Sequence, residues 1–353
     1  MVALLLDDPA AIRKIDVSDM LSALQKTPSR FLVPSDAEST CHIEIDTPTK
    51  ILFAGLGGSA IAGDILADYC RDIVEAPVTV CRSVKIPDFV DRSTLVVAIS
   101  YSGDTRETLS MLQQAKDRQA HVTIVASGGK LLGVARARGL PYLNVASNMP
   151  PRVALPELVA ALVHTLTEIG MIDKRSNLLE SASASTRTLI EGIKATVPVR
   201  ENPAKQVASS LHGHVPLLIG SEENFSVLRR FKNELNENSK MPAVFYTLPE
   251  AYHNDIEGLK ALKGLSNPQP VILRSSGQER NEQLEANKLV ETLSEFGYSS
   301  PVFFDGVGDE RFGWLLSAIT FGDFVSFYLA MLNGVDPSPL LLIPNFKSIK
   351  GLV

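Results

Sequence analysis

The chain has 353 residues, of which 45% are hydrophobic and 21% charged, and its formal net charge is -6. Its length predicts two domains, and its composition is that of a globular protein, which excludes a disordered or fibrous class. The acidic balance and the lack of a Lys/Arg-rich block argue against a nucleic-acid partner. We therefore expect two globular domains and no binding of nucleic acid.

The cysteines and the apolar segments bear on the compartment. Cys41, Cys70 and Cys81 are odd in number and show no CxxC spacing, so we predict buried thiols in a reducing compartment. The N-terminus lacks the basic start of a secretory signal. The apolar stretch "FGDFVSFYLAMLNGV", residues 321–335, contains Asp323 and is shorter than a bilayer span of about 20 residues. We predict a buried helix there, no membrane partner and a cytoplasmic location.

Short β-branched or leucine-rich runs alternate with helix-like segments along the chain. These runs end at Gly55, Ser100 and Ser127 in the first half and at Gly220, Ser276 and Gly306 in the second. Such alternation is typical of a parallel sheet with crossover helices. Because the order of elements repeats, we predict an α/β fold of two tandem doubly wound parallel-sheet domains.

A polar stretch separates the two halves. An amphipathic helix is predicted over residues 154–172, and the polar residues 173–185 follow it. We therefore place an N-terminal domain at residues 1–175 and a C-terminal domain at residues 176–353. The N-terminal domain would include a leading helical segment around "DVSDMLSALQK", residues 16–26.

The stretch "SYSGDTRET", residues 100–108, gathers small donors behind the apolar run "TLVVAI". A loop between a parallel strand and a helix offers free backbone N–H groups and the positive end of the helix dipole. Ser100, Ser102 and Thr105 would add hydroxyl donors, and Gly103 would let the backbone approach a ligand. This inventory matches the dianion of a sugar phosphate.

A second loop, "AGLGGSAIAGD" at residues 54–64, places Gly58 and Ser59 at the end of another predicted strand. Two strand ends can flank one ligand crevice. NAD binding is disfavoured because the G-x-G-x-x-G spacing fails at Ala60, and no Gly-Lys-Ser/Thr occurs for a Walker A loop. The alternative for the first loop is plain helix capping by Ser102.

No cofactor and no metal site are predicted. His212 and His214 form an "HGH" pair, but no third ligand stands at a telling spacing.

Several motifs together resemble one family. Besides the two loops, which look like the sugar isomerase (SIS) domain, they are "PPRVAL" (150–155), "NPAKQVA" (202–208), "NELNENSKMPA" (233–243), "LPEAYHNDIEG" (248–258) and "GVDPSPLLLIPNFK" (334–347). In this order they are similar to the bifunctional phosphoglucose/phosphomannose isomerases, a tandem-SIS branch of the phosphoglucose isomerase superfamily. The resemblance implies a cytoplasmic, metal-independent homodimer that interconverts glucose 6-phosphate and fructose 6-phosphate, and often mannose 6-phosphate as well.

The resemblance also assigns roles to residues. Its phosphate-binding side chains fall on Ser59, Ser100, Ser102 and Thr105. The family's catalytic groups fall on four residues of this chain. Arg152 would stabilise the enediolate, Glu237 would be the base, and His253 would open the sugar ring; Lys347 matches the active-site lysine near the C-terminus. In the family the histidine reaches across to the partner's active site.

Two positions have alternative interpretations. Asp104 stands where the family usually has Asn, and its negative charge would weaken phosphate binding if it pointed inward. Glu234 lies in the same stretch as Glu237, and the residues alone do not decide which of the two is the base. The alternative for either glutamate is an ordinary solvated acid of a helix.

Two other functions compete with the isomerase. SIS domains also serve as sugar-phosphate sensors, but the first 50 residues lack the basic character of a DNA-binding helix-turn-helix. An isomerase of another substrate, such as a ketose or amino-sugar phosphate, is the other alternative. Glu237, His253 and Lys347 together favour the hexose phosphate isomerase over the sensor.

Overall fold

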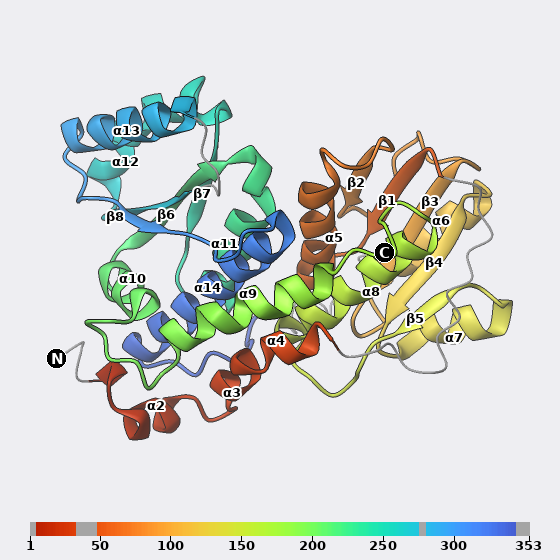
Figure 1. Ribbon diagram of the computed structural model, residues 1–353, viewed down its shortest axis with the longest axis horizontal. Coiled ribbons are helices and arrows are strands. Elements are labelled where there is room, and N and C mark those ends of the chain that lie inside the picture. Colours follow the sequence, from red (N-terminus) through yellow and green to blue (C-terminus); the bar gives the residue numbers. More distant parts are fainter. Residues whose placement is uncertain (1–4, 33–47, 275–279, 344–353) are drawn as a thin grey trace. The chain divides into compact units, whose positions relative to one another are not determined.

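The computed structural model in Figure 1 describes residues 5–32, 48–274 and 280–343. These residues divide into two compact units. The central unit is formed by residues 27–183, and the split unit combines residues 5–26 with residues 184–343. Each unit has its own parallel sheet, as predicted.

The units differ from the predicted domains at two places. The N-terminal segment belongs to the split unit and not to the N-terminal domain, and the division falls between Ser183 and Ala184. The polar stretch expected to be a boundary is largely helix α9 (Leu178–Ile193). Its small residues Ala182 and Thr186 are fully buried one turn apart, so the Ser/Ala-rich composition reflects close helix packing and not a linker.

The central unit is a five-stranded parallel sheet in the order β2-β1-β3-β4-β5. Its strands are β1 (Lys50–Ala54), β2 (Val78–Cys81), β3 (Thr94–Ser100), β4 (His121–Ala126) and β5 (Tyr142–Asn144). The helices are α4 (Thr27–Arg30), α5 (Gly57–Cys70), α6 (Arg106–Asp117), α7 (Gly129–Arg138) and α8 (Leu155–Glu168). One face of the sheet packs on α6 and α7 through apolar side chains, and α5 and α8 cover the other face. The inner strands β1, β3 and β4 are buried along almost their whole length because both faces of the sheet are covered.

The split unit has a four-stranded parallel sheet in the order β7-β6-β8-β9. Its strands are β6 (Val215–Ser221), β7 (Val244–Leu248), β8 (Pro268–Leu273) and β9 (Val302–Phe304). The helices are α2 (Pro9–Ile15), α3 (Met20–Gln25), α10 (Pro203–Leu211), α11 (Phe225–Glu237), α12 (Asp255–Leu265), α13 (Arg280–Glu295) and α14 (Arg311–Leu332). As Figure 1 shows, α12 and α13 cover one face and α11 and α14 the other.

Helix α14 includes the apolar stretch that was predicted to be a buried helix. Its length and hydropathy would allow it to cross a membrane, but 94% of its most apolar stretch is buried inside the protein. The prediction of a buried helix is therefore confirmed, and its beginning lies ten residues earlier than expected, at Arg311.

The side chains of the two described cysteines, Cys70 and Cys81, are buried. Cys70 and Cys81 are free thiols, and burial raises the pKa of Cys70 to about 12. Cys41 lies outside the described residues.

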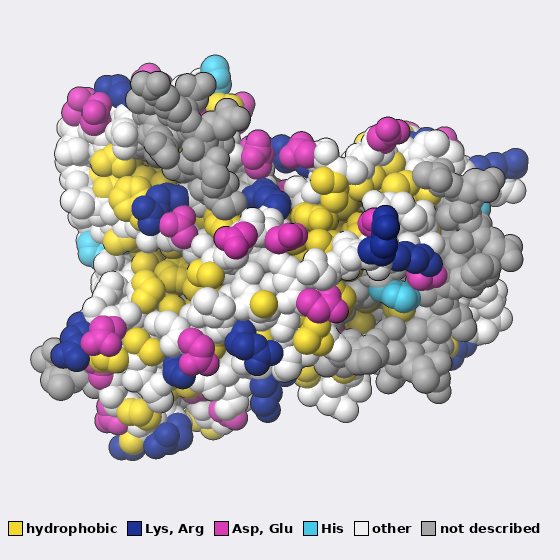
Figure 2. Space-filling model, viewed as in Figure 1, with side chains coloured by type: hydrophobic (Ala, Val, Ile, Leu, Met, Phe, Trp, Pro, Cys, Tyr) yellow, Lys and Arg dark blue, Asp and Glu magenta, His cyan; other side chains and the backbone are white. Residues whose placement is uncertain are grey.

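On the face drawn in Figure 2, Lys and Arg side chains lie interspersed with Asp and Glu.

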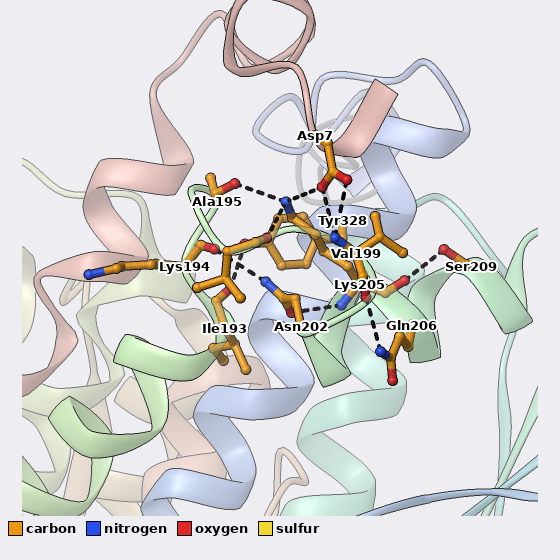
Figure 3. Close-up of polar contacts among 11 residues, drawn as sticks. Asp7, Ile193, Lys194, Ala195, Val199, Asn202, Lys205, Gln206, Ser209 and Tyr328 are labelled. Atoms are coloured by element: carbon orange, nitrogen blue, oxygen red, sulfur yellow. Dashed lines mark hydrogen bonds and ion pairs between the residues drawn. The ribbon is translucent and has the colours of Figure 1, made fainter. Parts of the chain in front are cut away.

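Lys205, in the stretch "NPAKQVA", is a structural residue that joins the N-terminal segment to the split unit. Its side chain is fully buried, and Nζ donates to Asp7 Oδ1 (3.0 Å) and to the carbonyls of Ala195 and Val197 (both 2.8 Å) (Figure 3). The Tyr328 ring lies 5.6 Å from Nζ. Burial lowers the pKa of Lys205, and Asp7 partly offsets this.

Candidate active site

The central unit has a topological switch point between β1 and β3. These strands are neighbours, β1 leads through α5 to β2 on one side, and β3 leads through α6 to β4 on the other. In doubly wound sheets, the crevice at the carboxyl ends of two such strands is where ligands bind. Both predicted loops lie here, because residues 55–59 follow β1 and residues 101–105 follow β3.

Three hydroxyl groups meet at this crevice. Ser100 Oγ and Thr105 Oγ1 are 2.8 Å apart, and Gly103 N donates to Ser100 Oγ (3.2 Å). Tyr101 N donates to Ser59 Oγ across the two loops (3.1 Å). Ser102 is exposed and accepts from Asp104 N (3.3 Å). The predicted cluster is thus assembled from both strand ends.

Two helices begin at the crevice without a side-chain cap. The N-cap residue of α5 is Leu56 and that of α6 is Thr105, and neither makes a side-chain cap hydrogen bond. Ser102 is therefore not the N-cap of α6, and the capping alternative for this serine is wrong. Uncapped helix N-termini present backbone N–H groups and a positive dipole to an anion.

Asp104 points at a neighbouring helix. Its Oδ1 accepts from Lys130 N (3.1 Å) in the first turn of α7. There the carboxylate satisfies an N-terminal donor and favours the helix dipole. The backbones are close at this point, because a Cβ added at Gly103 would lie 1.8 Å from Gly128 O. Asp104 is therefore a local cap of α7.

Arg152 lies in a short 3-10 turn, η1 (Pro151–Ala154), beside the α5 loop. A Cβ added at Gly58 would lie 3.7 Å from Pro151 O, so the two backbones adjoin. The Arg152 side chain is 7% exposed. The structure thus brings the phosphate-loop candidates and the turn of the candidate enediolate-stabilising arginine together within the central unit.

The split unit separates the roles of the two candidate bases. Glu234 is buried in α11, with Arg230 Nη1 2.8 Å from its Oε1 and Asn238 Nδ2 2.9 Å from its Oε2. Arg230 also pairs with Asp323 on α14 (Nε to Oδ1, 2.9 Å). Burial alone would lower the pKa of Arg230, but the neighbouring carboxylates raise it overall. Glu234 is committed to this cluster, whereas Glu237 is partly exposed.

The residues that follow Glu237 hold its position. Asn238 Nδ2 donates to Ser326 Oγ (2.9 Å), and Ser239 Oγ donates to Leu235 O (2.6 Å). Lys240 Nζ donates to the Glu237 carbonyl. The polar side chains of "NENSK" thus brace the end of α11, which supports a precise placement of the Glu237 carboxylate.

His253 follows a second 3-10 turn, η3 (Glu250–Tyr252), at the carboxyl end of β7. Its side chain is exposed. Its backbone N donates to Glu250 O (2.9 Å). Glu237 and His253 belong to the split unit, whereas Arg152 and the hydroxyl cluster belong to the central unit. Lys347 lies outside the described residues.

Sequence reasoning missed two residues that shape the site. Tyr101 was part of the quoted loop, but the sequence gave no sign that its backbone N would bind Ser59 of the other loop or that its OH would accept from Met149 N. Arg30 lies in a short helix, α4, and contacts residues far along the chain. No group of three or more His, Cys, Asp or Glu side chains suited to a metal occurs in the part of the chain that the structure describes.

The two domain profiles match known families. Residues 44–135 match the SIS domain, and residues 200–349 match the bacterial phospho-glucose isomerase C-terminal SIS domain. A bifunctional phosphoglucose/phosphomannose isomerase of Caldicellulosiruptor bescii is 31% identical over 308 residues, 87% of this chain and 91% of the relative. The chain belongs to the bifunctional phosphoglucose/phosphomannose isomerase family. It is therefore an isomerase with SIS domains.

Other members and a different enzyme complete the comparison. The Aquifex aeolicus bifunctional phosphoglucose/phosphomannose isomerase is 30% identical, over 85% of this chain and 90% of the relative. A D-glucosamine-6-phosphate 4-epimerase of Sulfolobus acidocaldarius is 33% identical, over 62% of this chain and 67% of the relative. The fold matches a glucose-6-phosphate isomerase like protein from Thermus thermophilus with a TM-score of 0.66 at 17% identity, covering 97% and 98% of the two chains. The predicted tandem SIS fold is confirmed.

Proposed function

We propose that the chain interconverts glucose 6-phosphate with fructose 6-phosphate, and mannose 6-phosphate with fructose 6-phosphate, by proton transfer through a cis-enediol. The observation that carries this proposal is the hydroxyl cluster between two uncapped helix N-termini, beside the Arg152 turn, in a chain of this family. We expect a cytoplasmic homodimer that serves glycolysis and gluconeogenesis.

Phosphate binding anchors the substrate. The hydroxyls of Ser59, Ser100 and Thr105 and the free N–H groups of α5 and α6 are matched to the three oxygens of a phosphate dianion. Because the phosphate is at C6, this contact fixes one end of the hexose and leaves C1 and C2 for the acid–base groups. Binding energy from this remote group helps to orient the reacting carbons.

The acid–base steps fall to Glu237 and His253. Hexose phosphates are mostly closed rings, so the ring oxygen must be protonated before isomerisation, and the His253 imidazole is suited to donate that proton. Glu237 then removes the proton from C2 of an aldose, or from C1 of the ketose, and returns it to the other carbon. The enediolate that forms between these steps carries negative charge. Arg152 stabilises that charge more than it stabilises the ground state.

The decisive test is turnover of both substrates. We expect the protein to convert fructose 6-phosphate to glucose 6-phosphate and mannose 6-phosphate to fructose 6-phosphate, in coupled assays with excess EDTA. The E237Q variant should lose at least about a hundredfold in kcat while keeping its fold, whereas E234Q should be less stable but keep kcat in its folded fraction. Full activity in E237Q would remove this residue from the role of base.

The second candidate is an epimerase of an amino-sugar phosphate. It is favoured only by the similarity to the D-glucosamine-6-phosphate 4-epimerase. Incubation with glucosamine 6-phosphate, followed by NMR of the C4 proton, distinguishes the two. Formation of the C4 epimer without conversion of either hexose 6-phosphate would favour the epimerase. Binding of hexose phosphate without any turnover would instead favour a sensor.

A further inference from the structure

Arg30, the last residue of α4, contacts the Arg152 turn directly. Its Nη1 donates to the carbonyl of Val153, the residue after Arg152 (2.8 Å). Its Nε lies 3.7 Å from Glu157 Oε1, in the first turn of α8. The side chains of Arg30 and Glu157 are 14% and 5% exposed. One guanidinium group thus binds the 3-10 turn and the helix that follows it, within the central unit.

A second contact holds the other side of this turn. Tyr101 OH accepts from Met149 N (3.0 Å), three residues before Arg152. Tyr101 is itself fixed, because its carbonyl accepts from Ser127 Oγ (2.6 Å) and its N donates to Ser59. Two prolines lie between Met149 and Arg152, and their fixed φ angles limit the motion of the segment. The turn is therefore held from both sides.

The Arg30–Glu157 pair is not a simple stabilising device. Burial raises the pKa of Glu157, and Arg30 opposes this. Glu157 Oε2 is buried and makes no hydrogen bond to any described residue. A buried pair of this kind contributes little net stability, but it fixes geometry because each partner restricts the other. Glu157 orients the Arg30 guanidinium through its Nε, and Nη1 of the same guanidinium donates to the Val153 carbonyl.

We infer that Arg30, oriented by Glu157, is a positioning residue that sets the place of the Arg152 guanidinium for the developing enediolate. This inference rests on the proposed function and on the role assigned there to Arg152. Displacing a catalytic group by about 1 Å can cost about a hundredfold in rate. Loss of the Arg30 contact should therefore lower kcat more than it changes KM, because the phosphate loop keeps its own contacts.

The first test compares R30M and R30K with the wild type in the conversion of fructose 6-phosphate. We expect R30M to lower kcat by about tenfold to a hundredfold and to change KM by less than about twofold. R30K keeps the charge near Glu157 but loses the fork, so its kcat should lie between those of R30M and the wild type. Wild-type kcat in R30M would overturn the inference.

Arg118 offers a control in the same unit that makes the same two kinds of contact, although its carboxylate partner Asp88 is exposed whereas Glu157 is buried. Its Nη1 donates to Pro87 O (2.5 Å) and its Nη2 lies 3.1 Å from Asp88 Oδ1, so it too joins a backbone carbonyl to a carboxylate. Arg118 follows α6 and lies toward the amino ends of the strands, away from the loops of the site. We expect R118M to keep kcat within about twofold of the wild type. A loss equal to that of R30M would indicate a general structural effect and overturn the inference.

Binding of a charged analogue gives a readout besides turnover. A five-carbon aldonate phosphate carries its carboxylate where the enediolate develops charge. We expect R152M to weaken its binding by about a hundredfold, R30M by about tenfold, and R30M in the R152M background to add less than about twofold. Additive losses would show that Arg30 does not act through Arg152. Wild-type binding of the analogue by R152M would refute the role assigned to Arg152 in the proposed function. Wild-type binding by R30M, together with weakened binding by R152M, would refute the inference about Arg30 and leave the proposed function standing.

A second variant guards against poor folding. R30M leaves the Glu157 carboxylate buried without its cation, whereas R30M/E157Q removes both charges. We expect the double variant to fold, as judged by circular dichroism, and still to show the loss in kcat, because the Val153 carbonyl has lost its donor. Recovery of wild-type kcat in R30M/E157Q would show that only an uncompensated charge was at fault and would overturn the inference.

Discussion

Replacing Asp7 with alanine tests how strongly the N-terminal segment is bound within the split unit. The change removes the acceptor of a hydrogen bond from Lys205 Nζ and of one from Val199 N (2.9 Å). A hydrogen bond to a charged group contributes about 1.5–3 kcal/mol. Because the Asp7 side chain is 36% exposed, water screens part of this contribution and also replaces the acceptor for Val199. We expect the free energy of unfolding to fall by about 2 kcal/mol at pH 7.

The loss should also depend on pH. Burial lowers the pKa of Lys205 from 10.5 and Asp7 raises it, so the D7A variant should have a still lower pKa in the folded state. Between that folded pKa and 10.5, the unfolded state binds more protons, and stability therefore rises with pH. The difference between D7A and the wild type should be largest near neutral pH and should shrink as the pH approaches 10.5.

Urea unfolding followed by tryptophan fluorescence measures this effect. Trp314 is the single tryptophan of the chain and lies buried in α14 of the split unit. Asp8 provides a neighbouring control, because its Oδ1 accepts from Ala10 N and caps α2 (2.8 Å). D8A should cost about 1 kcal/mol through the lost cap, with no change between pH 7 and pH 10. A D7A loss that is the same at both pH values would refute the reasoning.

Three further predictions concern the central unit. G103A should destabilise it by more than about 2 kcal/mol and raise KM strongly, because the residue has φ +72 and the new Cβ would meet Gly128 O; thermal unfolding and kinetics would show this, and a neutral result would contradict the close approach. D104N should leave KM within about twofold, because the side-chain oxygen can still accept from Lys130 N; a large drop in KM would mean that the Asp104 charge faces the substrate. E157Q should flatten the pH dependence of stability just above pH 4.5, since the raised pKa of Glu157 makes wild-type stability fall as the pH rises there; unchanged curves from acid titration would contradict this.

Much of the fold followed from the hydrophobic runs of the sequence. Six of the nine strands found in the described part of the chain were predicted, because they are continuous apolar segments of buried parallel sheets. The strands missed were β2, β5 and β7. Strands β2 and β7 are edges of the two sheets and consist mostly of half-buried residues. Strand β5 is the other edge of the central unit's sheet and has three residues. All three missed strands are edges, but β9 is an edge as well and was predicted from its apolar run, so edge position makes a strand harder to predict without hiding it in every case.

The site was predicted unevenly. Local sequence identified the loop from Ser100 to Thr105, because its donors follow a strand directly. The residues alone left Glu234 and Glu237 both open as the base, and the family resemblance assigned the role to Glu237. The structure adds that Arg230 and Asn238 engage the Glu234 carboxylate. The contacts of Arg30 were equally hidden, because they join residues 123 positions apart in the chain. The membership of the N-terminal segment in the split unit was missed for the same reason.

That the split unit is made from two separated stretches of chain has a consequence for its synthesis on the ribosome. Asp7 and Lys205 are 198 positions apart, and at about 5–20 residues per second a ribosome needs on the order of ten seconds or more to bridge them. During that time residues 27–183 can already fold as a unit, while the segment with α2 and α3 waits for its partner surface. Nascent chains that end before α10 and α14 would therefore leave the apolar residues Ile12, Met20 and Leu24 of these first helices without the surface that buries them in the folded protein.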